Sequence, residues 1–121
     1  MAALPDRNHS IPLTEAAEMT RRWRRAQPKA EKAGAFHADQ VKALLEQPGC
    51  AALRYYHALN EDGSYAIILV AVDHAGCDLT DGILLEMHFP CPPICEPLSD
   101  LATSAWVARA RTAGSDRLIP A

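Results

Sequence analysis

Three of the four cysteines and two of the five histidines fall in one short stretch of the second half of the chain. His88, Cys91 and Cys95 follow an H-x2-C-x3-C spacing, and His74 and Cys77 lie one predicted connection earlier. Thiolate and imidazole are the usual ligands of zinc, which takes four of them in structural sites. Against a zinc knuckle, the two prolines between the last two cysteines have no N–H to donate to a sulfur. We therefore expect no cofactor, with a zinc ion at these five residues as the alternative.

Cys91 and Cys95 also allow thiol chemistry. A neighbouring histidine lowers the pKa of a thiol or acts as its base, which is the role His88 would take. The prolines favour an extended segment, in which the two cysteines lie too far apart for a disulfide unless the chain turns at Pro93-Ile94. In a third interpretation all four cysteines are small buried apolar residues, and the sequence leaves the three open.

Three further residues are secondary candidates for the same chemistry. His57 shares a predicted strand face with Tyr55 and is either part of a polar pocket or a half-exposed strand residue. Glu86 alternates with His88 on the outward side of another predicted strand, as a general acid or base or as an exposed carboxylate. Cys50 begins the first predicted strand. No spacing among these residues fixes a reaction.

A basic segment with an aromatic residue at its centre lies near the N-terminus. Arg21, Arg22, Arg24 and Arg25 surround Trp23. Such a segment either contacts an anion such as a nucleic-acid phosphate or is a solvated helix face, favoured by the helix dipole, with its tryptophan turned to the core. We favour the second interpretation and expect no nucleic-acid partner, because the net charge of -3 lacks a basic surplus.

Helical periodicity predicts the elements that flank these candidates. An amphipathic helix begins at Pro12 or Thr14 and ends near Pro28, where a polar connection follows. A shorter helix, capped by Asp39, ends at Pro48-Gly49 and buries an apolar stripe of Val41, Leu44 and Leu45. A last helix begins at Pro97 or Ser99 and ends at Gly114.

Strand signals occupy the middle of the chain. Residues 50–59 alternate in the manner of a half-buried strand, and residues 60–63 form a hairpin connection with a glycine suited to positive φ. Residues 65–72 are apolar on both faces, which predicts a strand at the centre of a sheet. Residues 83–89 alternate until Pro90 ends the ladder, with His88 on the outward face.

These elements predict an α+β fold, with a three-stranded or slightly larger antiparallel sheet, two N-terminal helices and one C-terminal helix. A chain of 121 residues fits a single domain. We place this domain at residues 11–114, between a flexible arm at residues 1–10 and a flexible tail at residues 115–121.

Several classes of protein lose support. No apolar run approaches the length of a membrane span, and the first ten residues lack the apolar core of a signal peptide, so we expect no membrane partner and a cytoplasmic location. Thiols are normally reduced there. The motifs of dinucleotide-binding, nucleoside-triphosphate, zincin and serine-hydrolase sites are missing from the sequence.

Three local patterns of the sequence carry a resemblance to a protein family. They are Ile11 to Ala16, then Leu44 to Cys50 leading into Leu53 to Tyr56, and finally Leu69 to Asp73 followed by Gly76-x-Asp78 and Cys91-Pro92-Pro93-x-Cys95. Together they resemble a family of small uncharacterised bacterial proteins with a Gly-Cys before the first strand and a C-terminal CPPxC. The resemblance covers residues 11–95 and implies that Cys50, Cys91 and Cys95 are family features, without an established activity. This chain departs from it at Ala51-Ala52, where a glycine is expected, and in its C-terminal extension with Trp106.

The leading hypothesis is a cytoplasmic, non-enzymatic binding or regulatory domain. It would use a sheet face or the Cys/His end to hold a small ligand, a protein or a second copy of itself as a homodimer. The competing hypothesis is a metal- or thiol-dependent enzyme or redox protein centred on Cys91, Cys95 and His88. The leading hypothesis rests on the lack of a catalytic constellation with the required spacing.

Overall fold

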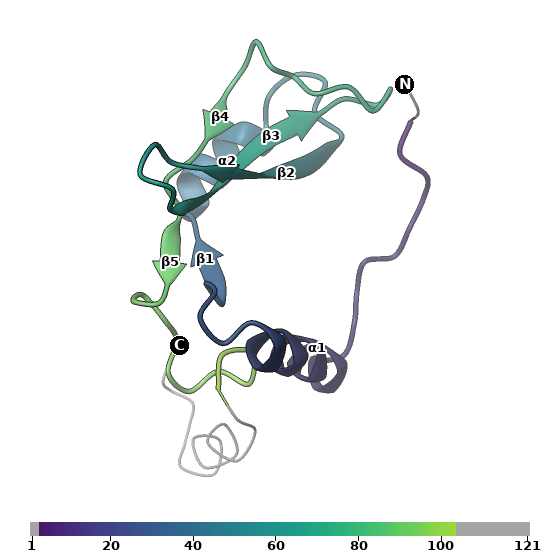
Figure 1. The fold of residues 1–121 in the computed structure, drawn as a ribbon. Coiled ribbons are helices and arrows are strands. Elements are labelled where there is room, and N and C mark those ends of the chain that lie inside the picture. Colours follow the sequence, from purple (N-terminus) through teal and green to yellow (C-terminus); the bar gives the residue numbers. More distant parts are fainter. Residues whose placement is uncertain (1–2, 104–121) are drawn as a thin grey trace. The chain divides into compact units, whose positions relative to one another are not determined.

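The computed structural model describes residues 3–103. Its elements, in chain order, are α1 (Leu13–Ala26), β1 (Ala33–Ala35), α2 (Ala38–Leu45), β2 (Ala52–Leu59), β3 (Tyr65–Val72), β4 (Leu84–Leu85) and β5 (Phe89–Cys91) (Figure 1). Strands β2, β3 and β4 form one antiparallel sheet in that order, and β1 and β5 form a second sheet of two strands. The predicted α+β class with an antiparallel sheet is confirmed.

The described chain divides into two compact units. One unit comprises residues 3–7 and 35–89, with α2 and the three-stranded sheet, and the other comprises residues 8–34 and 90–103, with α1. The expectation of a single domain with flexible ends stays a prediction.

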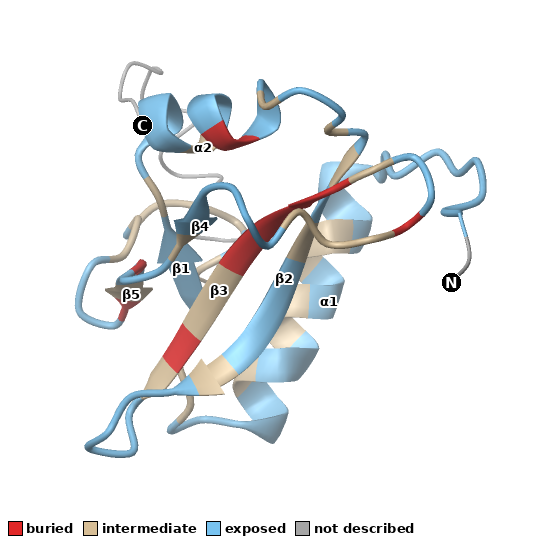
Figure 2. Ribbon diagram, turned by 90° about the horizontal axis from the view of Figure 1, so that it is seen from above, coloured by how far each residue is buried: buried red, intermediate tan, exposed pale blue. Residues whose placement is uncertain are grey.

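Strand β3 lies at the centre of the three-stranded sheet because it is apolar on both faces. Val70 and Val72 on one face and Ala71 on the other are buried, as the red part of β3 in Figure 2 shows. Strand β2 pairs with β3 along its full length of eight residues, from Ala52 opposite Val72 to Leu59 opposite Tyr65. The predicted central position of β3 is confirmed.

Helix α2 covers one face of this sheet. Leu44 is fully buried and packs against Leu69 and Ala71 of β3 in a cluster that half-buried apolar residues surround, namely Phe36, Val41, Cys50, Ile67, Leu79 and Leu85. Two details of the predicted helix are wrong. Asp39 lies inside the first turn, because the helix begins after His37, and Leu45, expected in the buried stripe, is 43% exposed.

The hairpin between β2 and β3 turns at a glycine, as predicted. Gly63 has a φ of 88° and its N–H donates to the carbonyl of Asn60. Positive φ costs glycine nothing, since it has no Cβ.

The third predicted strand, over residues 83–89, is wrong in its length and in the direction that its last side chains face. Strand β4 ends at Leu85, and Met87 has a φ of 64°, which lies outside the strand region. This residue reverses the expected alternation of faces: Met87 is 79% exposed, whereas His88, expected to face outward, is buried. The chain then enters β5.

The predicted polar connection after α1 contains strand β1, which the sequence analysis missed. A strand of only three residues, Ala33–Ala35, has too little periodicity to be recognised. The predicted C-terminal helix is also wrong over its described part, since residues 97–103 form turns and the described residues contain two helices, not three. Residues 104–114 of that expected helix, and the expected tail, lie outside the described residues.

Helix α1 confirms the first predicted helix, with Pro12 as its N-cap. Trp23 is not in a core, however: it is 48% exposed, and its indole N–H donates to the carbonyl of Glu31. Within residues 3–103, no helix has the length and apolar character needed to cross a membrane.

Replacing Leu44 by alanine tests the packing of α2 on the sheet. A buried leucine cut to alanine costs about 2–5 kcal/mol of unfolding free energy, because burial is lost and a cavity remains. Leu45→Ala is the matched control on the same helix, and we expect it to cost less than about 1 kcal/mol because Leu45 is 43% exposed. Urea unfolding followed by circular dichroism measures both, and equal losses would contradict the packing described.

Candidate functional site

Cys91 and Cys95 are joined in a disulfide, with their Cα atoms 4.9 Å apart. The peptide bonds preceding Pro92 and Pro93 are cis, and the N–H of Ile94 donates to the carbonyl of Pro90 at 2.8 Å. The segment is therefore a tight turn, and the predicted extended conformation is wrong. A disulfide between these two cysteines requires such a turn.

The structure does not gather the five candidate zinc ligands. Among residues 3–103, no three His, Cys, Asp or Glu side chains lie close enough together to hold a metal ion. His74 is exposed on a turn, and Cys77 is half-buried beyond it. The sulfurs of Cys91 and Cys95 are bonded to each other, so neither is a thiolate in this state.

The other two cysteines are free thiols in half-buried positions. The sulfur of Cys50 lies 3.4 Å from the carbonyl oxygen of Ala52, and its side chain packs against the core beside α2. The backbone N–H of Cys77 donates to the carboxylate of Asp73. These contacts fit the interpretation of Cys50 and Cys77 as small packing residues.

Two of the four candidate anion-binding arginines have partners within their own unit. Arg21 pairs with Glu18 on α1. Arg24 donates to the carbonyl oxygen of Leu101 at 2.7 Å and to that of Thr103 at 3.2 Å. The side chains of Arg22 and Arg25 are exposed. This distribution resembles a solvated helix face more than a concentrated anion site.

Two other candidates, His57 and His88, are linked by aromatic residues. From β2 the rings follow one another as Tyr55, His57, Tyr65, His88 and Phe36, with centroids 5.5, 5.9, 6.1 and 6.3 Å apart. The Nδ1 atom of His57 also lies 2.8 Å from the hydroxyl of Tyr65. We call these five residues the ring series. It stabilises one end of the sheet through tilted and edge-to-face ring contacts. The third secondary candidate, Glu86, is exposed in the segment after β4.

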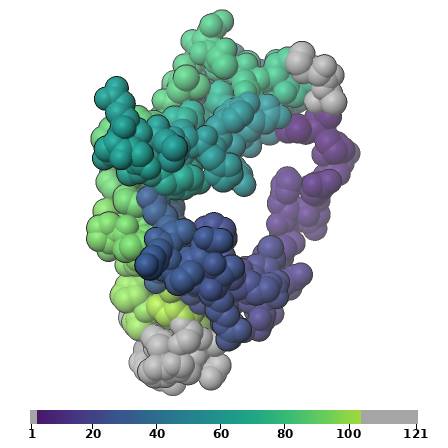
Figure 3. Space-filling view, viewed as in Figure 1, coloured from purple at the N-terminus to yellow at the C-terminus, as the bar shows by residue number. Residues whose placement is uncertain are grey.

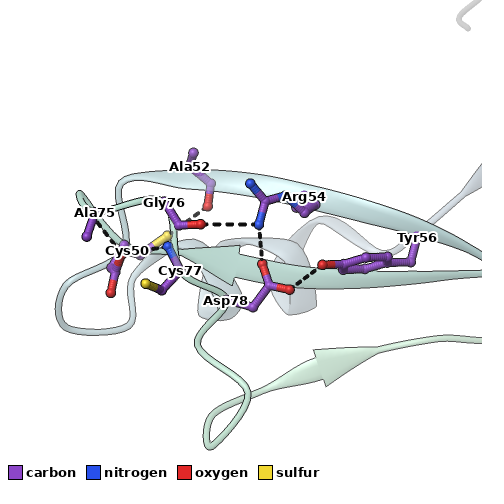
Figure 4. Close-up of polar contacts among 9 residues, drawn as sticks. Cys50, Ala52, Arg54, Tyr56, Ala75, Gly76, Cys77 and Asp78 are labelled. Carbon is purple, nitrogen blue, oxygen red and sulfur yellow. Dashed lines mark hydrogen bonds and ion pairs between the residues drawn. The ribbon is translucent and has the colours of Figure 1, made fainter. Parts of the chain in front are cut away.

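A second polar cluster lies on the opposite face of the sheet. The carboxylate of Asp78 accepts a hydrogen bond from the Tyr56 hydroxyl and another from the Arg54 guanidinium at 2.5 Å (Figure 4). The same guanidinium nitrogen lies 3.4 Å from the carbonyl oxygen of Gly76. The Asp78 side chain is 19% exposed and that of Arg54 33%. We call Arg54, Tyr56 and Asp78 the Asp78 cluster.

The members of the Asp78 cluster shift one another's ionisation. Hydrogen bonds from Tyr56 and Arg54 lower the pKa of Asp78, against the opposing effect of burial. Donation to the Asp78 carboxylate raises the pKa of Tyr56, and burial adds to this. The bond to Asp78 also raises the pKa of Arg54. The cluster therefore holds a deprotonated carboxylate between two donors.

The Asp78 cluster is not among the predicted sites, although its residues carry a signal in the sequence. Arg54 and Tyr56 stand two residues apart and so share a strand face, and Asp78 follows the turn that ends β3. Val72 and Asp78 form an antiparallel bridge, which brings the carboxylate back beside the sheet. The predicted sites centre on cysteine and histidine, and this cluster contains neither.

Both clusters draw residues from β2, which is an edge strand in the described sheet. Four of its large side chains are exposed: Leu53 by 44%, Tyr55 by 61%, Tyr56 by 45% and Leu59 by 72%. Figure 3 shows the teal atoms of the β2–β3 hairpin on the surface of that view. An exposed edge with large apolar side chains is a surface suited to contact.

Along this edge, backbone groups of β2 point away from the other strands of the described sheet. Just past the end of the strand, the N–H of Asn60 donates to the carbonyl of Ser64, so these two residues form a hydrogen-bonded pair. In an antiparallel ladder such pairs alternate with non-hydrogen-bonded pairs. Counting back in the observed register, residues 58, 56, 54 and 52 therefore face β3. The N–H and C=O groups that point away from the sheet are those of Leu53, Tyr55, His57 and Leu59.

No family model, curated protein or solved structure matches this chain. The resemblance to small bacterial proteins with a C-terminal CPPxC therefore stays a prediction. The function has to be argued from the site alone.

Thiol titration checks the disulfide. We expect the unfolded, unreduced protein to react at two thiols, those of Cys50 and Cys77, because Cys91 and Cys95 are bonded to each other. After reduction all four cysteines should react. Four reactive thiols before reduction, in protein purified without a reductant, would show that the bond does not form.

Asp78→Asn should reduce the loss of stability in acid. The pKa of Asp78 is lowered in the folded state from its ordinary value of 3.8, so the unfolded state binds more protons in this window. The contribution is complete above about pH 4 and is lost as the pH falls through the folded-state pKa. Urea unfolding at stepped pH should show this loss in the wild type and less of it in Asp78→Asn. Asp81→Asn, which removes an exposed carboxylate nearby, is the control and should behave as the wild type.

The same variant has a spectroscopic signature at high pH. The pKa of Tyr56 is raised from 10.0 by its hydrogen bond to Asp78, so Asp78→Asn should let Tyr56 ionise at lower pH. Ultraviolet titration of tyrosinate measures the change, and Tyr56→Phe assigns the signal. A titration identical in wild type and Asp78→Asn would contradict the hydrogen bond.

Proposed function

We propose that the chain is a non-enzymatic binding or regulatory domain that holds an extended strand of a partner along the outer edge of β2. One observation carries this proposal: β2 is an eight-residue edge strand of the described sheet, with large exposed apolar side chains and with outward backbone groups that no other strand of that sheet pairs. Addition of a strand to such an edge is a recurrent mode of polypeptide recognition, in which main-chain hydrogen bonds supply affinity and alternate side chains supply specificity.

The sequence of β2 supports this role, because it lacks the features that normally protect an edge. Native edge strands are shortened, bulged, or marked with proline or outward lysine. Strand β2, from Ala52 to Leu59, contains no proline, glycine or lysine and pairs with β3 in continuous register. Its one permanently charged side chain, Arg54, is engaged by Asp78 on a face of the sheet and does not guard the edge. A strand left open in this way favours pairing.

The two polar clusters favour a binding role over catalysis. In the Asp78 cluster, a carboxylate with a lowered pKa is held by Arg54 and Tyr56, which is a poor arrangement for a general base. In the ring series, His57 lies within hydrogen-bonding distance of Tyr65, and His88 is buried. These contacts fix β2 against its neighbours, and a fixed strand pairs at lower entropic cost.

The disulfide between Cys91 and Cys95 favours a second candidate, a thiol-dependent redox protein. Cys91 is buried and Cys95 half-buried, so exchange would begin at Cys95. The metal-dependent form of this candidate requires the bond to be reduced first, because zinc binds thiolates. Structural disulfides are rare in the cytoplasm, so a disulfide at the proposed cytoplasmic location favours a redox role over a structural one. Cys91→Ser with Cys95→Ser should leave strand binding unchanged if the first proposal is correct.

A peptide probe tests strand binding directly. The probe is a synthetic peptide with the sequence of residues 51–60, added to isotope-labelled protein and followed by amide hydrogen exchange. We expect slower exchange at the outward N–H groups of Leu53, Tyr55, His57 and Leu59, and little change at those that already bond to β3. A matched peptide with proline at the positions of Tyr55 and His57 lacks two donors and should protect these groups less.

The same amide-exchange experiment can also contradict strand binding. The proposal is supported when the outward amides gain protection from the peptide, or are already protected by a second copy in a dimeric sample. It fails when a monomeric sample shows protected outward amides, because the chain then covers its own edge. It also fails when exposed outward amides are unaffected by the peptide at millimolar concentration.

A further inference from the structure

We infer that the strand accepted by β2 is β2 of a second copy of this chain, running antiparallel with the two-fold axis at Tyr56. The inference rests on the proposed function and narrows it to one partner and one register. It would join the two three-stranded sheets into a continuous antiparallel sheet. An isologous contact of this kind closes on itself and leaves no further edge of β2 exposed.

The backbone limits the registers that two copies can adopt. Hydrogen bonds across the new edge require outward-facing residues of one copy to lie opposite outward-facing residues of the other. With the axis at Tyr56, Leu53 lies opposite Leu59 of the second copy, and Tyr55 lies opposite His57 of the second copy. All outward groups within β2 are then paired, with roughly eight main-chain hydrogen bonds for the whole contact.

The side chains are complementary in this same register. On the face toward α2, leucine meets leucine at the two ends, and tyrosine meets histidine next to the centre. On the other face Tyr56 meets its own copy at the axis, and Arg54 meets Ala58 of the second copy, which leaves room for the guanidinium. No like charges face each other, and aromatic and apolar cross-strand pairs of this type stabilise a sheet. The side chains that would be covered include the large apolar ones exposed on β2, namely Leu53, Tyr55, Tyr56 and Leu59.

Neighbouring registers are worse for identifiable reasons. An axis at Arg54 places two guanidinium groups opposite each other, and an axis at His57 places two imidazoles opposite each other and pairs Leu53 with Glu61. An axis at Tyr55 leaves Leu59 opposite Ala51, outside the strand. The register centred on Tyr56 alone pairs the outward residues of β2 with one another and avoids charge repulsion.

The dimer would also extend the ring series. In each copy His57 packs edge-on against Tyr55 at a centroid distance of 5.5 Å and lies 2.8 Å from the Tyr65 hydroxyl at Nδ1. Tyr55 of the second copy would lie across the new edge from the same imidazole. The ring series of the two copies would then form one continuous row across the contact, and each His57 would lie between tyrosines of both chains.

A charge exchange at the two ends of β2 tests the register. In the double variant L53K/L59K each introduced lysine faces another lysine across the contact, and we expect the dimer dissociation constant to rise about tenfold or more. In L53K/L59E each lysine faces a glutamate, and the constant should fall back toward the wild-type value. Both positions are exposed, at 44% and 72%, so the fold of each copy should be unaffected. Sedimentation equilibrium measures the constants, and circular dichroism checks the fold.

Cysteine cross-linking tests the axis independently. In Tyr56→Cys the two introduced thiols lie in a non-hydrogen-bonded pair at the axis, where Cα atoms are about 4.5 Å apart and a disulfide fits. In the control Ala58→Cys, on the same face of the same strand, the two Cα atoms would be roughly 13 Å apart. We expect oxidation to give a covalent dimer for the first variant and not for the second or for the wild type.

The outcomes separate this inference from the proposed function. The inference is overturned by a wild-type protein that stays monomeric at millimolar concentration, or by a dimer that forms but ignores the charge exchange and cross-links equally at both cysteines. A monomer whose outward amides exchange fast and become protected by the peptide of residues 51–60 overturns the inference alone and supports strand binding. A monomer whose outward amides are already protected overturns both.

Discussion

The apolar character of β3 on both of its faces is the constraint on which the three-stranded sheet depends. A strand of this kind loses stability on any exposed face or edge, so it requires a strand on each side and a cover above and below. Strand β2 pairs with the full length of one edge of β3, and β4 pairs with only part of the other edge. Helix α2 covers one face of β3. On the second face, Arg54 lies opposite Val70 in the ladder, and Asp78 forms a backbone β-bridge with Val72. The Asp78 cluster therefore lies on the face of the sheet that α2 does not cover. Because β3 takes the centre, β2 is left at the edge.

The parts of this sheet that could be predicted are those encoded by local pattern. Two apolar faces predict a central β3, and Gly63 with its positive φ closes the hairpin that sets the register with β2. The third strand could not be predicted, because residues 83–89 alternate as a strand does and methionine carries no mark of a left-handed conformation. The positive φ at Met87 costs free energy, and it persists only because the surrounding structure holds the chain there. In this conformation His88 turns into the ring contacts with Tyr65 and Phe36.

The candidate site shows a different limit of the sequence. Residue types directed attention to cysteine and histidine, yet what these side chains do depends on backbone geometry that their spacing does not reveal. A turn through the prolines brings Cys91 to Cys95, whereas an extended chain through the same residues would separate them. The link between His57 and His88 runs through Tyr65, the first residue of the apolar strand β3. Long-range contacts of this kind have no local signal.

The ring series and the Asp78 cluster both restrain the side chains of the edge strand β2. Arg54 and Tyr56 are bonded on one face to Asp78, and His57 is close to Tyr65 on the other, so alternate side chains of β2 are held from both sides. Ordering a side chain during association costs roughly 0.5–1.5 kcal/mol, and this cost falls when the rotamer is fixed beforehand. These contacts restrain alternate side chains of β2, whose outward backbone groups point away from the other strands of the described sheet. A strand prepared in this way favours pairing with another strand, and the self-complementary order of leucine, tyrosine and histidine along it favours its own copy.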